Sequence, residues 1–277
     1  MNLKHLPLCG ALKSAGTFTQ LWVLLVLLFA GCLTGSVELA FVAPAVLCAY
    51  FFSDNLWKYL HLDTPVSLKT VGLTILSVIA AYPVVNLTAV WNQSMVLPES
   101  LHSVEEWMRT AEDMAEAILT QMLYVTTVWG FLRNVLTLCL LAAIGEEFVF
   151  RGILTNILKK DGKTNPFLVI WIVAAVFSAI HIQFYGFVPR MLLGAYFGYL
   201  VYYTRSLWVP IVAHFTHNFI SIAACTYFQD SPEEMGDFDS IGAGSTLWLS
   251  AVCTVLFALL FLKIKTTASP DAGKAAG

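Results

Sequence analysis

The chain contains several apolar runs long enough to cross a lipid bilayer as helices, and this feature constrains its fold most. A membrane helix needs about 20 mostly apolar residues. Of the 277 residues, 58% are hydrophobic and 12% are charged, whereas soluble domains carry about 25% charged residues. The sequence therefore predicts an all-α fold, a polytopic transmembrane helix bundle of about eight membrane helices in a lipid bilayer. The candidate spans cover roughly residues 18–34, 37–53, 70–90, 131–158, 167–184, 188–204, 206–228 and 243–262. Seven spans are the alternative, because the second candidate is short and contains Pro44.

The basic residues outside the spans predict the orientation of the bundle. They gather in alternate connections, and the positive-inside rule places such connections in the cytoplasm. Both termini are then cytoplasmic, and the acidic segments 98–118 and 229–240 lie on the opposite side. The chain has compact loops and no organelle-targeting feature, which predicts a bacterial inner (plasma) membrane. The basic residues concerned are Lys4, Lys13, Lys58, Lys69, Lys159, Lys160, Lys163, Arg205, Lys263 and Lys265.

Three further segments have their own patterns. The basic N-terminus and the apolar run 21–32 have the layout of a signal peptide, but a retained first helix fits the topology better. Residues 104–119 place apolar side chains at helical spacing with acids opposite, which predicts an amphipathic helix near the outer interface. A plain connector is favoured over a substrate gate for this helix. The residues from 266 onward lack apolar content, which predicts a disordered tail.

Two glutamates and an arginine interrupt the fourth span in the stretch GEEFVFRG, residues 145–152. Ionisable side chains at this depth are costly and are functional candidates by default. Glu147 and Arg151 are four residues apart with the acid first, the better order for an ion pair. Glu146 points about 100° away around the helix and has no cation one turn on. We interpret Glu147–Arg151 as a structural clamp and Glu146 as a candidate general acid or base. The alternative is that all three charges only hold the bundle together.

Other polar side chains occur at similar depth in two more spans. His181 lies in the fifth candidate span, and His214, His217 and Asn218 lie in the seventh. His214 and Asn218 are four residues apart and so share a helix face. A single membrane histidine often only packs, but a glutamate, two histidines and an asparagine at one level indicate a site. The net charge of −3 argues against a nucleic-acid partner. The six cysteines form no CxxC pair and are interpreted as small buried residues.

The chain resembles the CaaX protease and bacteriocin-processing family, intramembrane glutamate proteases related to type II CaaX prenyl endopeptidases. EEFVFR at 146–151 is similar to the EExxxR motif of this family, FSAIH at 177–181 to FxxxH, and HFTHN at 214–218 to HxxxN. Each motif alone is weak, but together and in order they are specific. The resemblance covers about residues 120–225 and divides the chain in three. Residues 1–117 hold the N-terminal membrane helices and the outer amphipathic segment, 118–228 the catalytic core, and 229–277 the outer acidic loop, last membrane helix and tail.

The resemblance implies a role for each motif residue. Glu146 and His181 would hold and deprotonate a water molecule that attacks the scissile carbonyl. His214 and Asn218 would donate hydrogen bonds to the oxyanion, and Glu147 and Arg151 would support the site. These roles agree with the residue-level interpretation of an unpaired acid in a water-poor cavity. His217 lies outside the family pattern and is interpreted as a packing or supporting residue.

The resemblance implies no cofactor and a peptide or membrane-protein substrate, prenylated or not; it does not predict the oligomeric state. Three other functions remain open. His181, His214, His217 and Glu146 could hold zinc in a metal-dependent membrane protease, although HExxH is absent and Asn218 is a poor zinc ligand. A transporter or proton relay also uses buried acids and histidines. A non-catalytic membrane scaffold or bacteriocin-immunity protein would keep the fold without the chemistry.

Overall fold

The computed structural model describes residues 8–36, 38–159, 162 and 164–268, and this part of the chain is helical and contains no strand. The helices that cross the bundle are α1 (Thr17–Cys32), α2 (Ala43–Phe52), α4 (Leu68–Gln93), α9 (Pro166–Ala179), α10 (Phe187–Thr204), α11 (Trp208–Tyr227) and α13 (Leu247–Ala268). One further pass, Val128–Leu158, consists of α6 (Val128–Asn134), the π-helix η3 (Val135–Leu141), α7 (Ala142–Glu147), the π-helix η4 (Phe148–Leu154) and α8 (Thr155–Leu158). The connections contain η1 (Glu38–Val42, π), α3 (Leu56–Tyr59), η2 (Glu99–Leu101, 3-10), α5 (His102–Leu123), η5 (Phe184–Gly186, 3-10), α12 (Pro232–Asp239) and η6 (Gly244–Thr246, 3-10).

Each of the eight predicted spans contains a helix of the structure. Within the described residues, however, four helical stretches are long and apolar enough to cross a membrane. These are Leu68–Gln93, Val128–Leu158, Trp208–Tyr227 and Pro232–Thr267, the last taking in α12 and α13. The protein is therefore an integral membrane protein. Thr17–Cys32, Ala40–Phe52 and Pro166–Ala179 are apolar but shorter. The count of about eight spans stays a prediction, because a 14-residue helix such as α9 is only about 21 Å long at 1.5 Å per residue.

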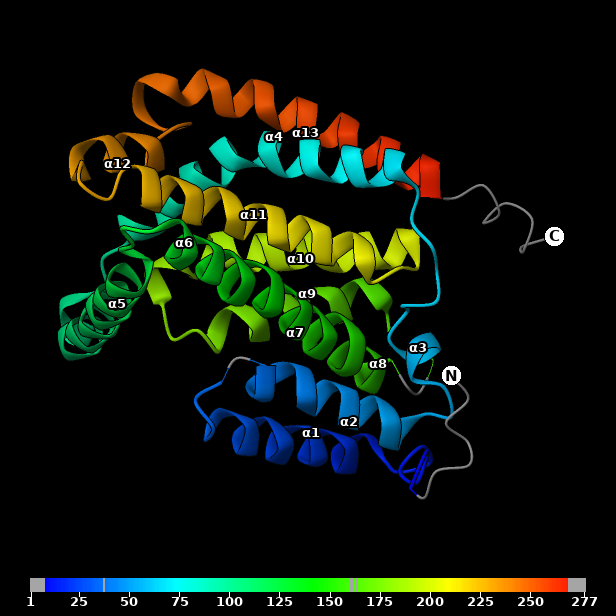
Figure 1. The fold of residues 1–277 in the computed structure, drawn as a ribbon. Coiled ribbons are helices and arrows are strands. Elements are labelled where there is room, and N and C mark those ends of the chain that lie inside the picture. The colour runs from blue at the N-terminus through cyan, green and yellow to red at the C-terminus, as the bar shows by residue number, and fades with distance from the viewer. Residues whose placement is uncertain (1–7, 37, 160–161, 163, 269–277) are drawn as a thin grey trace.

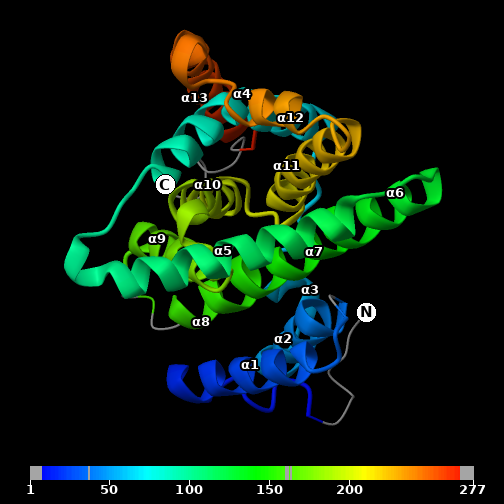
Figure 2. The same cartoon turned by 90° about the vertical axis from the view of Figure 1, so that its left-hand side faces the viewer.

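The crossing helices lie side by side, with α1 and α2 at one edge of the bundle and α4 and α13 at the other (Figure 1). The pass Val128–Leu158, α9, α10 and α11 fill the space between these pairs (Figures 1 and 2). One buried apolar cluster joins α1 and α2 to η4 and α9, and a second joins α4, α10, α11 and α13. The predicted tail begins inside α13, and residues 269–277 lie outside the described residues.

Two glycines allow the pass Val128–Leu158 to lie close to the N-terminal elements. A Cβ atom on Gly145 would lie 2.8 Å from Phe41 Cβ, and one on Gly152 would lie 2.7 Å from Leu60 Cδ2. Both distances are shorter than a carbon–carbon contact permits. Gly194 has the same use on α10, where an added Cβ would lie 3.2 Å from both Arg151 Nη2 and Phe177 Cδ1. These three glycines therefore permit close approach between neighbouring elements.

The amphipathic segment forms a longer helix than predicted. α5 extends from His102 to Leu123 rather than over 104–119, and it crosses one end of the bundle (Figure 2). Trp107, Met114 and Ile118 on this helix are largely exposed. An exposed apolar stripe beside a charged face is typical of helices that lie in the bilayer interface.

Candidate active site

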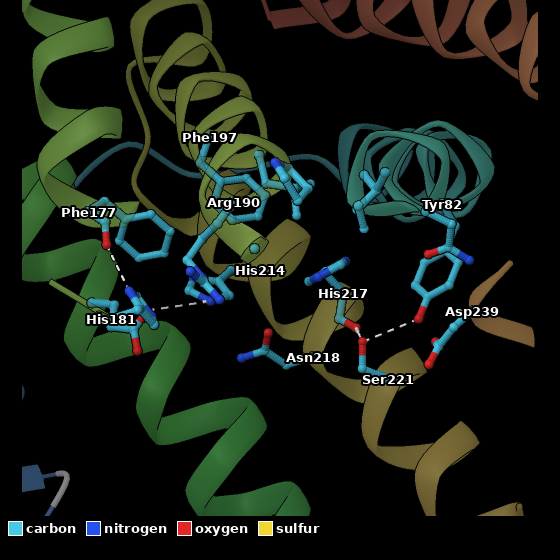
Figure 3. A pocket seen from close by; sticks show the side chains of 17 residues that line it. Tyr82, Phe177, His181, Arg190, Phe197, His214, His217, Asn218, Ser221 and Asp239 are labelled. Carbon is cyan, nitrogen blue, oxygen red and sulfur yellow. Dashed lines mark hydrogen bonds and ion pairs between the residues drawn. The ribbon is translucent and has the colours of Figure 1, made fainter. Parts of the chain in front are cut away.

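A cavity of about 330 Å³ lies among α4, α7, α9, α10 and α11. Glu146, His181, His214 and Asn218, the four residues predicted to be catalytic, all line it. Figure 3 shows them with the other lining side chains. The convergence predicted from their similar depth is therefore present in the structure. The roles assigned to them remain predictions, which the geometry makes more specific.

Glu147 and Arg151 lie behind the cavity wall, and both are buried. Arg151 Nη1 donates to Glu147 Oε1 at 2.8 Å, so the clamp predicted from the i, i+4 spacing is present. Arg151 Nη2 donates to the carbonyl oxygen of Gly194 at 2.9 Å. The guanidinium carbon also lies 4.6 Å from the ring centroid of Phe177, a cation–π distance. Through Arg151, the pass Val128–Leu158 therefore contacts both α9 and α10.

His214 is held by the same carboxylate that binds Arg151. Its Nδ1 lies 2.9 Å from Glu147 Oε1, and its ring stacks on Phe197 at a centroid distance of 5.1 Å. An ionised carboxylate only accepts hydrogen bonds, so Nδ1 carries the proton and donates. Nε2 then faces the cavity, 3.7 Å from Glu146 Oε2. The sequence did not predict the Glu147–His214 contact.

Glu146 is the acid of the pair that faces the cavity. Its side chain is 16% exposed, whereas that of Glu147 is 0% exposed. It forms no hydrogen bond among the described residues, and its nearest charged partner is His214. The two glutamates therefore have different surroundings, and the availability of Glu146 as an acid or base stays a prediction.

His181 lies outside a helix, which corrects the prediction that it belongs to a span covering 167–184. α9 ends at Ala179, and His181 follows in a turn. Ile182 has a left-handed backbone with φ of 54°, an unfavourable conformation for a β-branched residue. His181 Nδ1 lies 2.8 Å from the carbonyl oxygen of Phe177, so this nitrogen also carries a proton and donates. Nε2 of neutral His181 is therefore an acceptor.

Asn218 and His217 make contacts that the sequence did not predict. Asn218 Nδ2 donates to the carbonyl oxygen of Leu138 at 3.0 Å, in the π-helix η3, so one amide hydrogen already has an acceptor. His217 lines the cavity, although it was interpreted as a packing residue, and its ring centroid lies 5.9 Å from that of Tyr82. The His217 ring therefore lies toward α4, which carries Tyr82.

Arg190 is a cavity residue that the sequence analysis missed. It lies in the first turn of α10 and lines the cavity. Nη2 donates to Gln183 Oε1 at 2.9 Å, and Nη1 donates to the carbonyl oxygen of Gln183 at 3.3 Å. The signal was available, because an arginine in the apolar run 187–204 is as unusual as the acids in the fourth span.

The far side of the cavity has a different polar group of side chains. Tyr82 Oη lies 3.3 Å from Ser221 Oγ, and Asp239 of α12 also lines this side (Figure 3). Ser221 Oγ donates to the carbonyl oxygen of His217 at 3.2 Å. These residues extend the polar lining from the motif residues to the acidic connection after α11.

α5 packs on the connection that follows His181. The backbone N–H of Tyr185 donates to Glu112 Oε2 at 3.2 Å, and the guanidinium of Arg109 lies 4.4 Å from the ring centroid of Tyr185. The rings of Trp107 and Phe184 have centroids 5.2 Å apart. The predicted connector therefore also supports the segment that carries His181.

The cavity side chains do not form an assembled metal cage. Among the described residues, no group of three His, Cys, Asp or Glu side chains is arranged to hold a metal ion. His181 and His214 each bind a protein acceptor through Nδ1. Zinc dependence stays open as an alternative that a chelator would test.

One comparison with known proteins gives a match. Residues 128–220 match the family model described as type II CAAX prenyl endopeptidase Rce1-like. The matched part extends from α6 into α11 and includes the three motifs, so the resemblance stated from those motifs is confirmed. No curated protein and no solved structure matches the chain.

Proposed function

We propose that this protein is an intramembrane endopeptidase in which Glu146 activates a water molecule to hydrolyse a peptide bond. The observation that carries the proposal is the separation of two adjacent acids. Glu147 is fixed by Arg151 and His214, whereas Glu146 faces the cavity beside them. The family match supports peptide hydrolysis in particular.

The cavity contains the groups that this reaction needs. Glu146 and the Nε2 acceptor of neutral His181 would hold the water, and Glu146 would take its proton as the water oxygen attacks the scissile carbonyl. The free amide hydrogen of Asn218 would donate to the oxygen that becomes negative. The proton on Glu146 would then pass to the departing amine. His214 would join as a second donor only as an imidazolium, because Glu147 holds its Nδ1 proton.

The polar lining favours a peptide as the substrate. A volume of about 330 Å³ is within the range of small-ligand sites, and polar groups line both sides of it. A transporter or a proton relay would need a polar path beyond this cavity.

The test is a comparison of peptides in cells that carry the wild-type protein or Glu146→Gln at matched expression. Gln keeps the size of Glu146 but cannot accept a proton at neutral pH, so we expect cleavage products to disappear. Glu106→Gln is the matched control, because Glu106 is exposed on α5 and lies outside the cavity lining. Products that persist in a folded Glu146→Gln protein would refute Glu146 as the base. Identical peptide sets in all three strains would favour a non-catalytic scaffold.

A further inference from the structure

The motif residues that line the cavity offer few hydrogen-bond donors for an oxyanion. Neutral His181 and neutral His214 each use their Nδ1 proton on a protein acceptor, so each offers the cavity only an acceptor at Nε2. Asn218 has already given one amide hydrogen to Leu138. One donor that is independent of histidine protonation therefore remains among these residues, whereas oxyanion sites stabilise the developing charge with several preorganised donors.

Arg190 has the N–H donors and the positive charge that the motif residues lining the cavity lack. Its guanidinium is fixed by two hydrogen bonds to Gln183, which leave its other N–H groups unassigned. No carboxylate of the described residues forms an ion pair with it. Arg190 and Glu146 nevertheless line the same cavity. Figure 3 shows Arg190 reaching from α10 toward the part of the cavity with His181 and His214.

We propose that Arg190 is a further catalytic residue, whose guanidinium donates to the oxyanion alongside Asn218. This proposal rests on the endopeptidase function proposed above. As the water oxygen bonds to the carbonyl carbon, Glu146 takes the water proton and the carbonyl π electrons move to oxygen. Arg190 would stabilise that negative oxygen without giving up a proton. The electron pair then reforms the carbonyl, the C–N bond breaks, and the amine leaves with the proton from Glu146.

The position of Arg190 supports a transition-state role. It lies in the first turn of α10, where the positive end of the helix adds to its own charge. Its tether to Gln183 holds the side chain before substrate binds, so little reorganisation is needed during the reaction. The same tether links Arg190 to the turn that carries His181. A purely positioning role is therefore the alternative that the experiment must separate.

The first experiment adds Arg190→Gln to the peptide comparison in cells, with Arg133→Gln as the matched control. Arg133 is an exposed arginine of α6 that does not line the cavity. We expect Arg190→Gln to lose all Glu146-dependent products uniformly, and Arg133→Gln to keep them. Full retention in Arg190→Gln would overturn the inference and leave the endopeptidase proposal intact. Loss confined to products with an acidic residue or a free carboxylate next to the cleaved bond would instead make Arg190 a substrate-binding residue. If Glu146→Gln changes nothing, both proposals fail.

The second experiment measures kinetics on the purified full-length protein in liposomes, with one peptide cleaved in the first experiment. Arg190→Gln should lower kcat about 100- to 1,000-fold with little change in KM. Arg190→Ala should regain activity when guanidine hydrochloride is added at millimolar concentration, because the free guanidinium can occupy the vacated space. Gln183→Ala keeps the charge and removes the hydrogen bond from Nη2 to Oε1, while the backbone carbonyl of residue 183 can still accept from Nη1. We expect a loss of less than about 10-fold. A Gln183→Ala loss as large as that of Arg190→Gln, with no rescue by guanidine, would reduce Arg190 to a positioning residue.

Discussion

Arg151→Met is the change that tests the buried clamp most directly. Met nearly keeps the volume of Arg151 but removes the cation, which is 2% exposed and binds Glu147 and Gly194. Removing one partner of a buried ion pair costs about 3–5 kcal/mol, because the other charge is left uncompensated. His214 still donates to Glu147 at 2.9 Å, so we expect the lower end, a loss of about 3 kcal/mol in the free energy of unfolding.

The loss would be measured by SDS unfolding of the purified protein from mixed micelles, with Arg133→Met as the control for removal of an exposed arginine. Glu147→Gln and the double variant complete a double-mutant cycle. The double variant buries no lone charge, so it should recover more than half of the loss caused by Arg151→Met. An Arg151→Met midpoint equal to that of the wild type would refute the clamp. Fully additive single losses would show that the two side chains do not stabilise each other.

Three other changes test different parts of the molecule. His214→Ala should lower cleavage at least about 100-fold while His217→Ala stays within a few-fold; equal losses, together with inhibition by a chelator, would restore the zinc alternative. Gly152→Val should lower the free energy of unfolding in SDS by about 1–3 kcal/mol, because its Cβ has no room. Gly72→Val, at a glycine with open space, is the control. The Glu105 carboxylate accepts hydrogen bonds from Arg109 and a backbone N–H, which hold its pKa below the ordinary 4.5. The stabilisation of α5 by these hydrogen bonds is fully present above the ordinary pKa and is lost as the pH falls through the lowered pKa. Hydrogen-exchange protection of the first turns of α5 should therefore drop at acidic pH. Unchanged protection would contradict this prediction.

The features that the sequence predicted well depend on periodicity and on local spacing. The helical passes follow from apolar runs, and the Glu147–Arg151 pair follows from i, i+4 geometry. The convergence of Glu146, His181 and His214 followed from their similar depth in the bilayer. Each of these inferences needs only the length of a helix or the angle between two neighbouring residues.

The features that the sequence did not predict depend on contacts between distant residues. The Glu147–His214 hydrogen bond joins positions 67 apart, and no local spacing encodes it. The position of Arg190 depends on Gln183, which lies in the non-helical connection between α9 and η5, where a regular helix was expected. The π-helices η3 and η4 are local departures from the 3.6-residue period, and the apolar pattern around them does not change enough to reveal them.

The two adjacent glutamates divide the work of the site because one helix turns them toward different surroundings. Arg151 and His214 both donate to Oε1 of the buried Glu147. Glu147 thereby fixes the His214 tautomer and directs Nε2 to within 3.7 Å of Glu146 Oε2. The costly buried pair thus holds an imidazole in place beside the carboxylate that we propose as the base. Glu147→Gln could still accept from His214, but it would lack the charge that stabilises an imidazolium. We therefore expect Glu147→Gln to slow mainly the steps that protonate His214 and to have a small effect on steps that use the neutral ring, whereas Glu146→Gln would remove the proposed base from every turnover.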